Sequence, residues 1–409
     1  MTAAYEDFLA RKLARALPTG IADHGPLSAA LFPFQRDLTS WALRRGRAAI
    51  FADTGLGKAR MQVEWARVVA AHVRRPVLLL APLAVAAQTA AEGAKIGVKV
   101  AVCRSQEDAI EAVNVTNYER LHRFDPSAFG GVGLDESSCI KHHDAKTLAR
   151  LMVAFADTPF RLCCTATPSP NDYTELGTHA EFLGICSRAE MLAEFFVHDG
   201  GDTSSWRLKG HARDVFWRFV ASWGALVRRP SDLGYSDDGY ILPPLTVEHH
   251  VVEADHGDAR RAGLLFAKDA TTLTERRTAR KASLGSRVAL AVAMANASAA
   301  PWVIWCDLTA ESEALADGIR GAVEVRGADD IDEKETRLGD FAGGRARVIV
   351  TKPSIAGFGL NWQHCARMAF VGVTDSFEAY YQAVRRCWRF GQRRPVEVHV
   401  FTSDLEGNV

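Results

Sequence analysis

Short apolar segments alternate along this chain with stretches whose apolar residues recur at helical spacing. Alternation of this kind is typical of α/β proteins built on parallel sheets. In the first half, the pattern predicts strands at residues 48–51, 76–80, 113–116, 132–134 and 160–164. In the second half, it predicts strands at residues 302–305, 323–325, 348–350, 368–371 and 396–401.

The stretch between the two halves has a different composition. Residues 186–240 are rich in Trp, Phe and Arg, and their pattern is mostly helical. Leu242-Pro-Pro-Leu245 then ends any helix and opens an extended segment at residues 246–252. We therefore expect four parts: a helical lead-in (1–30), a first lobe (31–185), a mostly helical inter-lobe segment (186–245) and a second lobe (246–409).

Length and composition indicate an ordinary globular protein. The chain has 409 residues, of which 48% are hydrophobic and 24% charged, and its length favours two domains. The apolar run at residues 77–87 is shorter than a membrane span, and the N-terminus lacks the layout of a signal peptide. Eight cysteines without a CxxC pair favour reduced thiols. We expect a cytoplasmic protein with no membrane partner.

The charges balance to a net value of zero, so no global field attracts nucleic acid. Binding to nucleic acid would depend on local basic clusters. Taken singly, each cluster is better interpreted as a solvated face. These clusters are residues 44–47, 228–229, 276–281 and 385–394.

The strongest local signal is the glycine-rich stretch at residues 52–59, which lies between a predicted strand and a predicted helix. Gly55 and Gly57 would let backbone amides approach phosphate oxygens, and Lys58 would neutralise phosphate charge. Ala59 stands where a Ser or Thr normally ligates Mg²⁺. Because Mg²⁺ usually keeps several waters, we expect weakened metal binding and not a dead site. The predicted ATP contacts in this loop are Thr54, Gly55, Leu56, Gly57, Lys58 and Ala59.

Two further signals follow strands of the first half. Asp135 and Glu136 come directly after a short apolar strand. Asp135 would hold Mg²⁺ through water, and Glu136 would orient or deprotonate the attacking water. Thr165 and Thr167 end the next strand, where their hydroxyls would hydrogen-bond the acidic loop and couple the nucleotide to the second lobe. The alternative is a solvated turn for Asp135 and Glu136, and a simple strand-ending turn for Thr165 and Thr167.

Two more candidates are weaker. Gln35 has a carboxamide that suits the edge of adenine, with a surface glutamine as the alternative. Residues 139–143, Cys-Ile-Lys-His-His, have poor spacing for a metal site. Lys141 is better interpreted as a phosphate contact or an inter-lobe contact.

The second half ends in an arginine-rich string. Gln382, Arg386 and Arg389 recur at i, i+4 and i+7, so we expect them on one helical face. Guanidinium groups suit phosphate, and an arginine finger stabilises the transition state of phosphoryl transfer. A basic solvated helix is the alternative. Earlier in this half, residues 351–361 form a loop with two glycines after a predicted strand.

The order of these motifs resembles superfamily 2 helicases, and within them the Swi/Snf-type ATPases, most closely the compact versions encoded by phages and prophages. The likeness rests on Gly55-Leu-Gly-Lys58, Asp135-Glu136, Thr165-Ala-Thr-Pro168, Leu226-Val-Arg-Arg229 before Leu242-Pro-Pro-Leu245, Gly357 to Asn361, and Gln382 to Gln392. Three features depart from the family pattern. Ala59 lacks the hydroxyl, and Arg385 stands where larger members have glycine. The sequence also ends at Val409, just after the last predicted strand, where the family pattern leads us to expect a helical tail.

The resemblance implies two RecA-like parallel-sheet lobes in tandem, with ATP between them and duplex DNA across both. Gly359 and Asn361 would join the ATP site, Gln382 would couple the lobes, and Arg386 and Arg389 would act as fingers. A monomer without strong sequence specificity is expected, and a methylase, a nuclease or a replication protein are candidate partners. The DNA contact candidates are Pro82, Asn117, Lys141, Lys352, Arg228 and Arg229.

We therefore predict an ATP-hydrolysing, Mg²⁺-dependent translocase on double-stranded DNA. Two alternatives stay open at this point. One is a strand-separating helicase of phage replication. The other is an ATP-gated DNA clamp that is nearly inactive because of Ala59.

Overall fold

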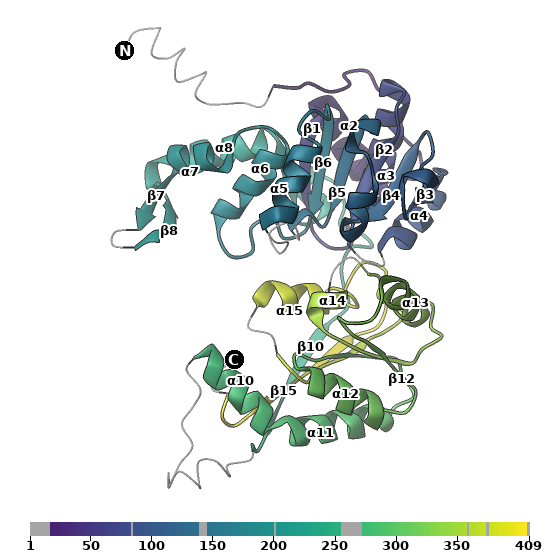
Figure 1. The fold of residues 1–409 in the computed structure, drawn as a ribbon, viewed down its shortest axis with the longest axis vertical. Helices are drawn as coiled ribbons and strands as arrows, with labels where there is room; N and C mark the ends of the chain where they lie inside the picture. The colour runs from purple at the N-terminus through teal and green to yellow at the C-terminus, as the bar shows by residue number, and fades with distance from the viewer. Residues whose placement is uncertain are drawn as a thin grey trace. The chain divides into compact units, whose positions relative to one another are not determined.

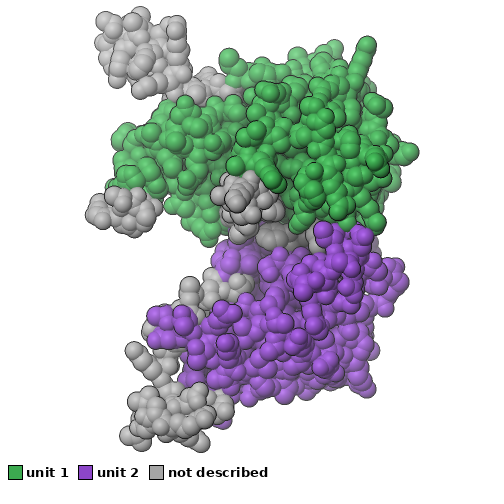
Figure 2. All heavy atoms as spheres, viewed as in Figure 1, with its two compact units in different colours: residues 1–240 green, residues 241–409 purple. Residues whose placement is uncertain are grey.

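The structure is a computed structural model that describes residues 17–82, 85–138, 145–199, 202–254, 272–357, 360–373 and 376–406. The chain divides into two compact units, residues 1–240 (unit 1) and residues 241–409 (unit 2), which are coloured separately in Figure 2.

Unit 1 is built on a parallel sheet of seven strands in the order β3-β4-β2-β5-β6-β1-β9 (Figure 1). The strands read as continuous apolar runs because helices cover both faces of the sheet. The strands are β1 (Arg47–Ala52), β2 (Val77–Ala81), β3 (Val100–Val102), β4 (Val113–Asn117), β5 (Gly131–Asp135), β6 (Phe160–Thr165) and β9 (Gly224–Val227).

Two apolar cores lie on opposite faces of this sheet. Ala48, Ile50 and Ala52 of β1 belong to one core, while Ala49 and Phe51 belong to the other, as alternation along a strand requires. The first core includes residues of α2 (Pro33–Arg45), α3 (Lys58–Val73) and α4 (Val85–Lys95), and the second includes residues of α5 (Ala145–Ala154), α6 (Leu176–Phe182), α7 (Arg188–Phe195) and α8 (Arg213–Ala221). Short 3₁₀ turns complete the unit: η1 (Gln106–Asp108), η2 (Tyr118–Arg123), η3 (Pro126–Ala128), η5 (Tyr173–Glu175), η6 (Gly210–Ala212) and η7 (Pro230–Leu233).

Two stretches of unit 1 differ from the pattern-based expectation. The segment expected to be mostly helical contains α7 and α8, but also an antiparallel hairpin of β7 (Phe196–Asp199) and β8 (Asp202–Leu208), and strand β9. β9 is only four residues long, and its pairing with β1 is a tertiary contact that local pattern does not encode. In the lead-in, residues 17–30 are not helical, and Pro18 and Pro26 disfavour a helix there.

Unit 2 is built on a parallel sheet of six strands in the order β10-β15-β14-β11-β13-β12. The extended segment predicted at residues 246–252 is the edge strand of this sheet. The strands are β10 (Leu245–Val252), β11 (Trp302–Trp305), β12 (Ala322–Val325), β13 (Val348–Thr351), β14 (Arg367–Phe370) and β15 (Val396–Ser403). The helices are α10 (Leu273–Ala282), α11 (Leu284–Asn296), α12 (Thr309–Gly318), α13 (Ile331–Ala342), α14 (Pro353–Ala356) and α15 (Phe377–Val384).

The predicted fold class is confirmed: the chain is α/β, with two parallel-sheet lobes in tandem. All ten strands predicted from apolar segments are present within a residue or two of their expected bounds. Among the helices that the structure describes, none is long and apolar enough to cross a membrane.

Candidate functional site

The predicted nucleotide motifs of unit 1 meet at one edge of its sheet. β6 lies between β1 and β5, and all three strands run parallel. The register pairs Phe51 with Thr165 and Cys164 with Asp135, so the three strands end side by side. The loops that follow them therefore share the carboxyl edge, which is where open parallel sheets bind ligands.

The glycine loop connects β1 to the N-terminus of α3, as its sequence predicts. Gly57 caps the helix with a φ of 83°, in the left-handed region that favours glycine. A Cβ atom there would lie 2.3 Å from the Gln35 side-chain nitrogen, so a larger residue would clash. The predicted contacts Thr54 to Ala59 thus form a tight loop at the start of a 16-residue helix. Such a helix start is a ready anion site.

Lys58 is buried at this loop. Its ammonium donates to the carbonyl oxygens of Ala52 at 2.9 Å and Asp53 at 3.4 Å. Its positive charge also acts on Asp135 at the end of β5, where it lowers the carboxyl pKa. The structure therefore brings the loop lysine and the first acidic residue together.

Asp135 is held by two residues that the sequence analysis missed. Gln62 Nε2 donates to Asp135 Oδ1 at 2.7 Å, and the Tyr118 hydroxyl donates to the Asp135 carbonyl at 2.8 Å. Burial and the charge of Glu136 raise the pKa of Asp135 to about 6, against the opposing effects of Gln62 and Lys58. Gln62 follows Lys58 by four positions on α3, so helical spacing alone would have placed both on one face.

Glu136 is also buried, and its backbone has a φ of 46°. A non-glycine residue in this left-handed region is strained, and such residues cluster at functional sites. Glu136 Oε2 accepts a hydrogen bond from Thr165 Oγ1 at 3.2 Å. Ser138 Oγ lies 3.1 Å from Thr165 Oγ1 and 3.4 Å from Thr167 Oγ1. The hydrogen bonds expected between the Thr165–Thr167 segment and the acidic loop are present.

His179 of α6 is a further residue that the sequence analysis missed. Its Nε2 atom lies 3.0 Å from the Ser137 hydroxyl, and its ring packs edge-on against Phe51 of β1 at 5.2 Å. His179 therefore supports the acidic loop from the second core. No local sequence signal links a histidine 42 residues downstream to that loop.

Gln35 lies against the glycine loop and is buried, so it is not a surface glutamine. Its Oε1 atom accepts from the Phe32 backbone N–H at 3.0 Å, and its Nε2 atom donates to the Leu56 carbonyl at 2.9 Å. These bonds fix the carboxamide beside the loop. Adenine recognition by Gln35 stays a prediction.

The residues at this edge fit a magnesium–nucleotide complex, with one ligand fewer than usual. The loop offers helix N-terminal amides and a lysine, and the acidic pair offers the oxygen donors that Mg²⁺ prefers. A carboxyl with a pKa of about 6 is mostly ionised at pH 7. Ala59 contributes only a methyl group at the second position of α3, so the metal contact there would be through water.

The arginine string of unit 2 departs from the predicted geometry. Helix α15 ends at Val384, so Arg386 and Arg389 lie in the turns after it, and the prediction of one helical face through Arg389 is wrong. The side chain of Gln392 folds this segment back on itself. Its Nε2 atom donates to the carbonyls of Gln363, Cys365 and Cys387 at 3.0, 2.9 and 3.2 Å.

The two predicted fingers have different surroundings. Arg386 is 0% exposed, and it donates to the Gln382 carbonyl at 2.8 Å, the Gln382 side chain at 2.9 Å and the Leu360 carbonyl at 3.2 Å. Arg389 is partly exposed and donates to the same Leu360 carbonyl at 3.0 Å. Gln382, Arg386 and Arg389 are thus brought together around Leu360, although not by a helix.

Asn361, the next residue after Leu360, is a predicted ATP contact. Its Oδ1 atom is buried, and within the described ranges it has no hydrogen-bond partner. A buried acceptor of this kind normally finds a donor in the protein, water or a ligand. Gly359 lies outside the described residues.

The predicted DNA contacts vary in accessibility. Arg228 and Arg229 are exposed after β9, and Pro82 is partly exposed after β2. Lys352 of unit 2 is partly exposed, with Nζ 3.4 Å from Thr309 Oγ1. Asn117 is only 1% exposed, and its Oδ1 atom accepts from the Arg120 N–H at 3.2 Å, which caps η2. Lys141 and the Cys139–His143 cluster lie outside the described residues.

No protein-family model matches this chain, and no curated protein matches it. Among solved structures, the SWI2/SNF2 ATPase core of Sulfolobus solfataricus in complex with dsDNA is similar to it, at 16% sequence identity and a TM-score of 0.44. The similarity covers 92% of this chain and 88% of that chain. The fold is defined by the two parallel sheets themselves.

Proposed function

We propose that this chain is an ATP-dependent, DNA-stimulated motor that hydrolyses ATP between its two lobes and translocates on double-stranded DNA. The observation that carries the proposal is the convergence of Lys58, Asp135 and Glu136 at one sheet edge. Gln62 and Thr165 hold the two carboxylates through hydrogen bonds of 2.7 and 3.2 Å. A phosphate loop, two acidic groups and a coupling hydroxyl are the parts that phosphoryl transfer to water requires.

In this proposal each residue of unit 1 has one task. Lys58 and the amides of the glycine loop bind the phosphates, and Asp135 holds a metal-bound water. Glu136 accepts the proton of the attacking water, because a carboxylate fixed by a hydroxyl is a positioned general base. Mg²⁺, when bound, would neutralise charge on the phosphates. Thr165 connects Glu136 to the Thr167 segment through Ser138, which suits a role in coupling.

The second lobe would supply a positive charge. This charge would stabilise the negative charge that develops on the phosphoryl group in the transition state. Arg389, which is partly exposed, is the better candidate for the finger. Arg386 is fully buried, and its bonds to Gln382 and Leu360 support a role in shaping the loop that presents Arg389. This division of roles is a refinement of the two-finger prediction.

DNA would be bound through its phosphates. Arg228, Arg229 and Lys352 carry accessible positive charge, whereas the net charge of the chain is zero. Contacts of this kind give little sequence specificity and a steep dependence on salt. Double-stranded DNA as the preferred form, a monomeric state and the compact phage type stay predictions from the motif resemblance.

The second candidate function is an ATP-gated DNA clamp with little turnover. Ala59 favours it, because the residue removes a direct Mg²⁺ ligand from the glycine loop. Strand separation is the other alternative, and no residue of the described site favours it.

Phosphate release from ATP, measured with duplex, single-stranded and forked DNA, tests the proposal. The translocase predicts hydrolysis that duplex DNA stimulates at least as strongly as a fork does. A requirement for single strands or forks would favour the unwinding helicase. ATP-dependent DNA binding without hydrolysis, followed by hydrolysis in Ala59→Thr, would favour the clamp. Hydrolysis that ignores every DNA would refute a DNA motor.

A further inference from the structure

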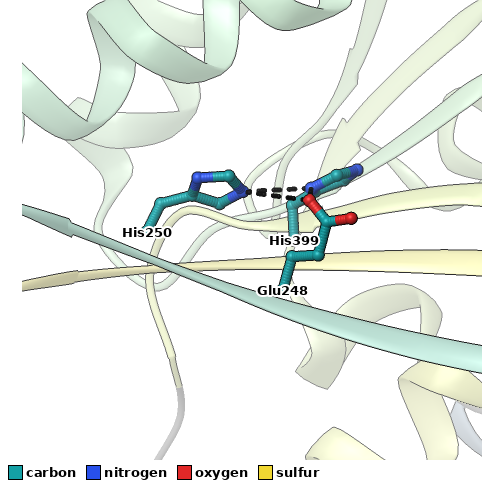
Figure 3. Close-up of side chains that lie close together, drawn as sticks. All are labelled: Glu248, His250 and His399. Atoms are coloured by element: carbon teal, nitrogen blue, oxygen red, sulfur yellow. Dashed lines mark hydrogen bonds and ion pairs between the residues drawn. The ribbon is translucent and has the colours of Figure 1, made fainter.

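A second cluster of ionisable side chains lies within unit 2, on the strand pair β10 and β15. Glu248 and His250 occupy alternate positions of β10 and therefore face the same side of the sheet. The register of the two parallel strands places Glu248 beside His399 of β15. Figure 3 shows the two imidazole rings and the carboxylate turned toward one another.

The distances between the three side chains are those of a ligand set. His250 Nε2 lies 3.1 Å from His399 Nδ1 and 4.0 Å from Glu248 Oε2, and His399 Nδ1 lies 3.4 Å from the same oxygen. For these separations there is a point about 2.1 Å from all three atoms, and Zn–N and Zn–O bonds in proteins are about 2.0–2.2 Å long. One ion at this point would contact every ligand without a change in the backbone.

We propose that Glu248, His250 and His399 form a binding site for a divalent transition-metal ion, with Zn²⁺ as the best match. Two imidazoles and one carboxylate suit Zn²⁺ and its neighbours, whereas Mg²⁺ and Ca²⁺ prefer oxygen ligands alone. Three protein ligands also leave a coordination position for water. The site uses none of the residues assigned to nucleotide binding, so it does not depend on the proposed function.

The rings are positioned before any metal binds. His399 is 6% exposed and packs against the Trp302 ring at 5.5 Å, and His250 stacks on Phe401 at 4.9 Å. Each imidazole would bind a metal ion in its neutral form. Glu248 is exposed, and its flexible side chain can close the third bond.

The position of the site suggests what the metal would do. β10 is one of the two edge strands of the sheet, and among the described residues β15 is the strand that pairs with it. β10 is also the first strand of unit 2, and β15 is its last strand in the described residues. A shared metal would cross-link the two strands and hold β10 in the sheet, so we infer a structural site that stabilises unit 2.

Zinc binding by the full chain tests this proposal. The protein would be treated with a chelator, kept free of nucleotide and titrated with ZnCl₂ by calorimetry, with metal content measured after gel filtration. We expect one Zn²⁺ per chain and a rise in the thermal midpoint on zinc addition. Co²⁺ should give the visible bands of a low-coordinate site that contains nitrogen ligands.

The variants are chosen so that the fold survives. His250→Gln and Glu248→Gln alter the two more accessible ligands, and each should weaken zinc binding by at least about tenfold and remove the thermal shift. His249→Gln is the matched control, because His249 is an exposed neighbour on the opposite face of β10 and should bind zinc like the wild type. If wild type binds no zinc, or if His250→Gln and His249→Gln bind it equally, the three residues are only a hydrogen-bonded cluster and the proposal is wrong.

Discussion

The two units hold their candidate functional charges in different ways. In unit 1, Asp135 and Glu136 are each bound by a side chain from another element, Gln62 and Thr165. In unit 2, Arg386 is satisfied by a residue of the preceding helix turn and by the Leu360 carbonyl. The acidic pair is therefore held by side chains of α3 and β6, whereas Arg386 is held by Gln382 and by the backbone at Leu360.

The contacts of the two arginines indicate a structural role for Arg386 and leave a catalytic role to Arg389. Arg386 is fully buried and its guanidinium is hydrogen-bonded to Gln382 and to the Leu360 carbonyl, whereas Arg389 is partly exposed and donates to the same carbonyl. We therefore expect replacement of Arg389 to lower the rate of ATP hydrolysis and replacement of Arg386 to lower the stability of the fold.

The largest expected effect is that of Arg389→Ala. Loss of an arginine finger lowers turnover by about 10³-fold or more. The DNA-stimulated rate of ATP hydrolysis should fall by that order while the thermal midpoint stays within about 2 °C of wild type. Arg345→Ala, at an exposed arginine of the same unit, is the control. A rate within tenfold of wild type would remove Arg389 from the chemistry.

Glu136→Gln should have the next largest effect. Removing the general base lowers the rate by about 10²–10⁴-fold, while the amide retains the shape and an acceptor for the Thr165 hydroxyl. ATP binding, measured with a fluorescent analogue, should be kept. Glu107→Gln, at an exposed position of η1, should behave like wild type. Equal rates for the two variants would contradict the role of Glu136.

Arg386→Ala should act mainly on stability. Each hydrogen bond to a charged group contributes about 1.5–3 kcal/mol, and the Gln382 side chain would lose its hydrogen bond to this guanidinium. We expect the thermal midpoint to fall by about 5 °C or more, with a loss of activity that Arg386→Lys restores in part. An unchanged midpoint with lost activity would instead make Arg386 a second finger.

The pH dependence of the rate of ATP hydrolysis should report the hydrogen bond between Gln62 and Asp135. Metal binding requires ionised Asp135, so the rate should fall as the pH drops below about 6, the carboxyl pKa. Gln62→Leu removes a donor that lowers this pKa, and the acid limb should move upward by up to about one pH unit. The groups around Asp135 that set the limb are Glu136 and Lys58. An acid limb that does not move would exclude Asp135 as its source.

The same raised pKa has a consequence for stability. The folded chain disfavours the ionised form of Asp135, so the contribution of this residue to stability is greatest below its ordinary pKa of 3.8 and is lost as the pH rises through about 6. Asp135→Asn should accordingly raise the thermal midpoint more at pH 8 than at pH 4. The opposite trend would mean that the carboxylate is stabilised by its neighbours.

Ala59→Thr should have the smallest effect. A direct hydroxyl ligand should lower the Mg²⁺ concentration for half-maximal rate by about tenfold or less. The maximal rate should change little if a water already serves at this position. If the wild type does not hydrolyse ATP and Ala59→Thr does, the result would favour the ATP-gated DNA clamp.

Much of the fold could be predicted because buried parallel strands are continuous apolar runs. The influence of the Lys58 charge on Asp135 followed from strands that end at one edge. β9 escaped prediction because an edge strand of four residues has little pattern of its own. The end of α15 also escaped, since Gln392 holds the segment after it through bonds to the carbonyls of Gln363 and Cys365, which lie 29 and 27 residues away in sequence.

The central claim is that Lys58, Asp135 and Glu136 hydrolyse ATP in response to DNA. The most direct test is the rate of phosphate release by the full chain, with and without duplex DNA, for wild type and Glu136→Gln at saturating Mg²⁺. The account predicts that duplex DNA accelerates the wild type and that the variant is slower by at least about 10²-fold under both conditions. Hydrolysis that is indifferent to DNA, or that survives in the variant, would contradict it.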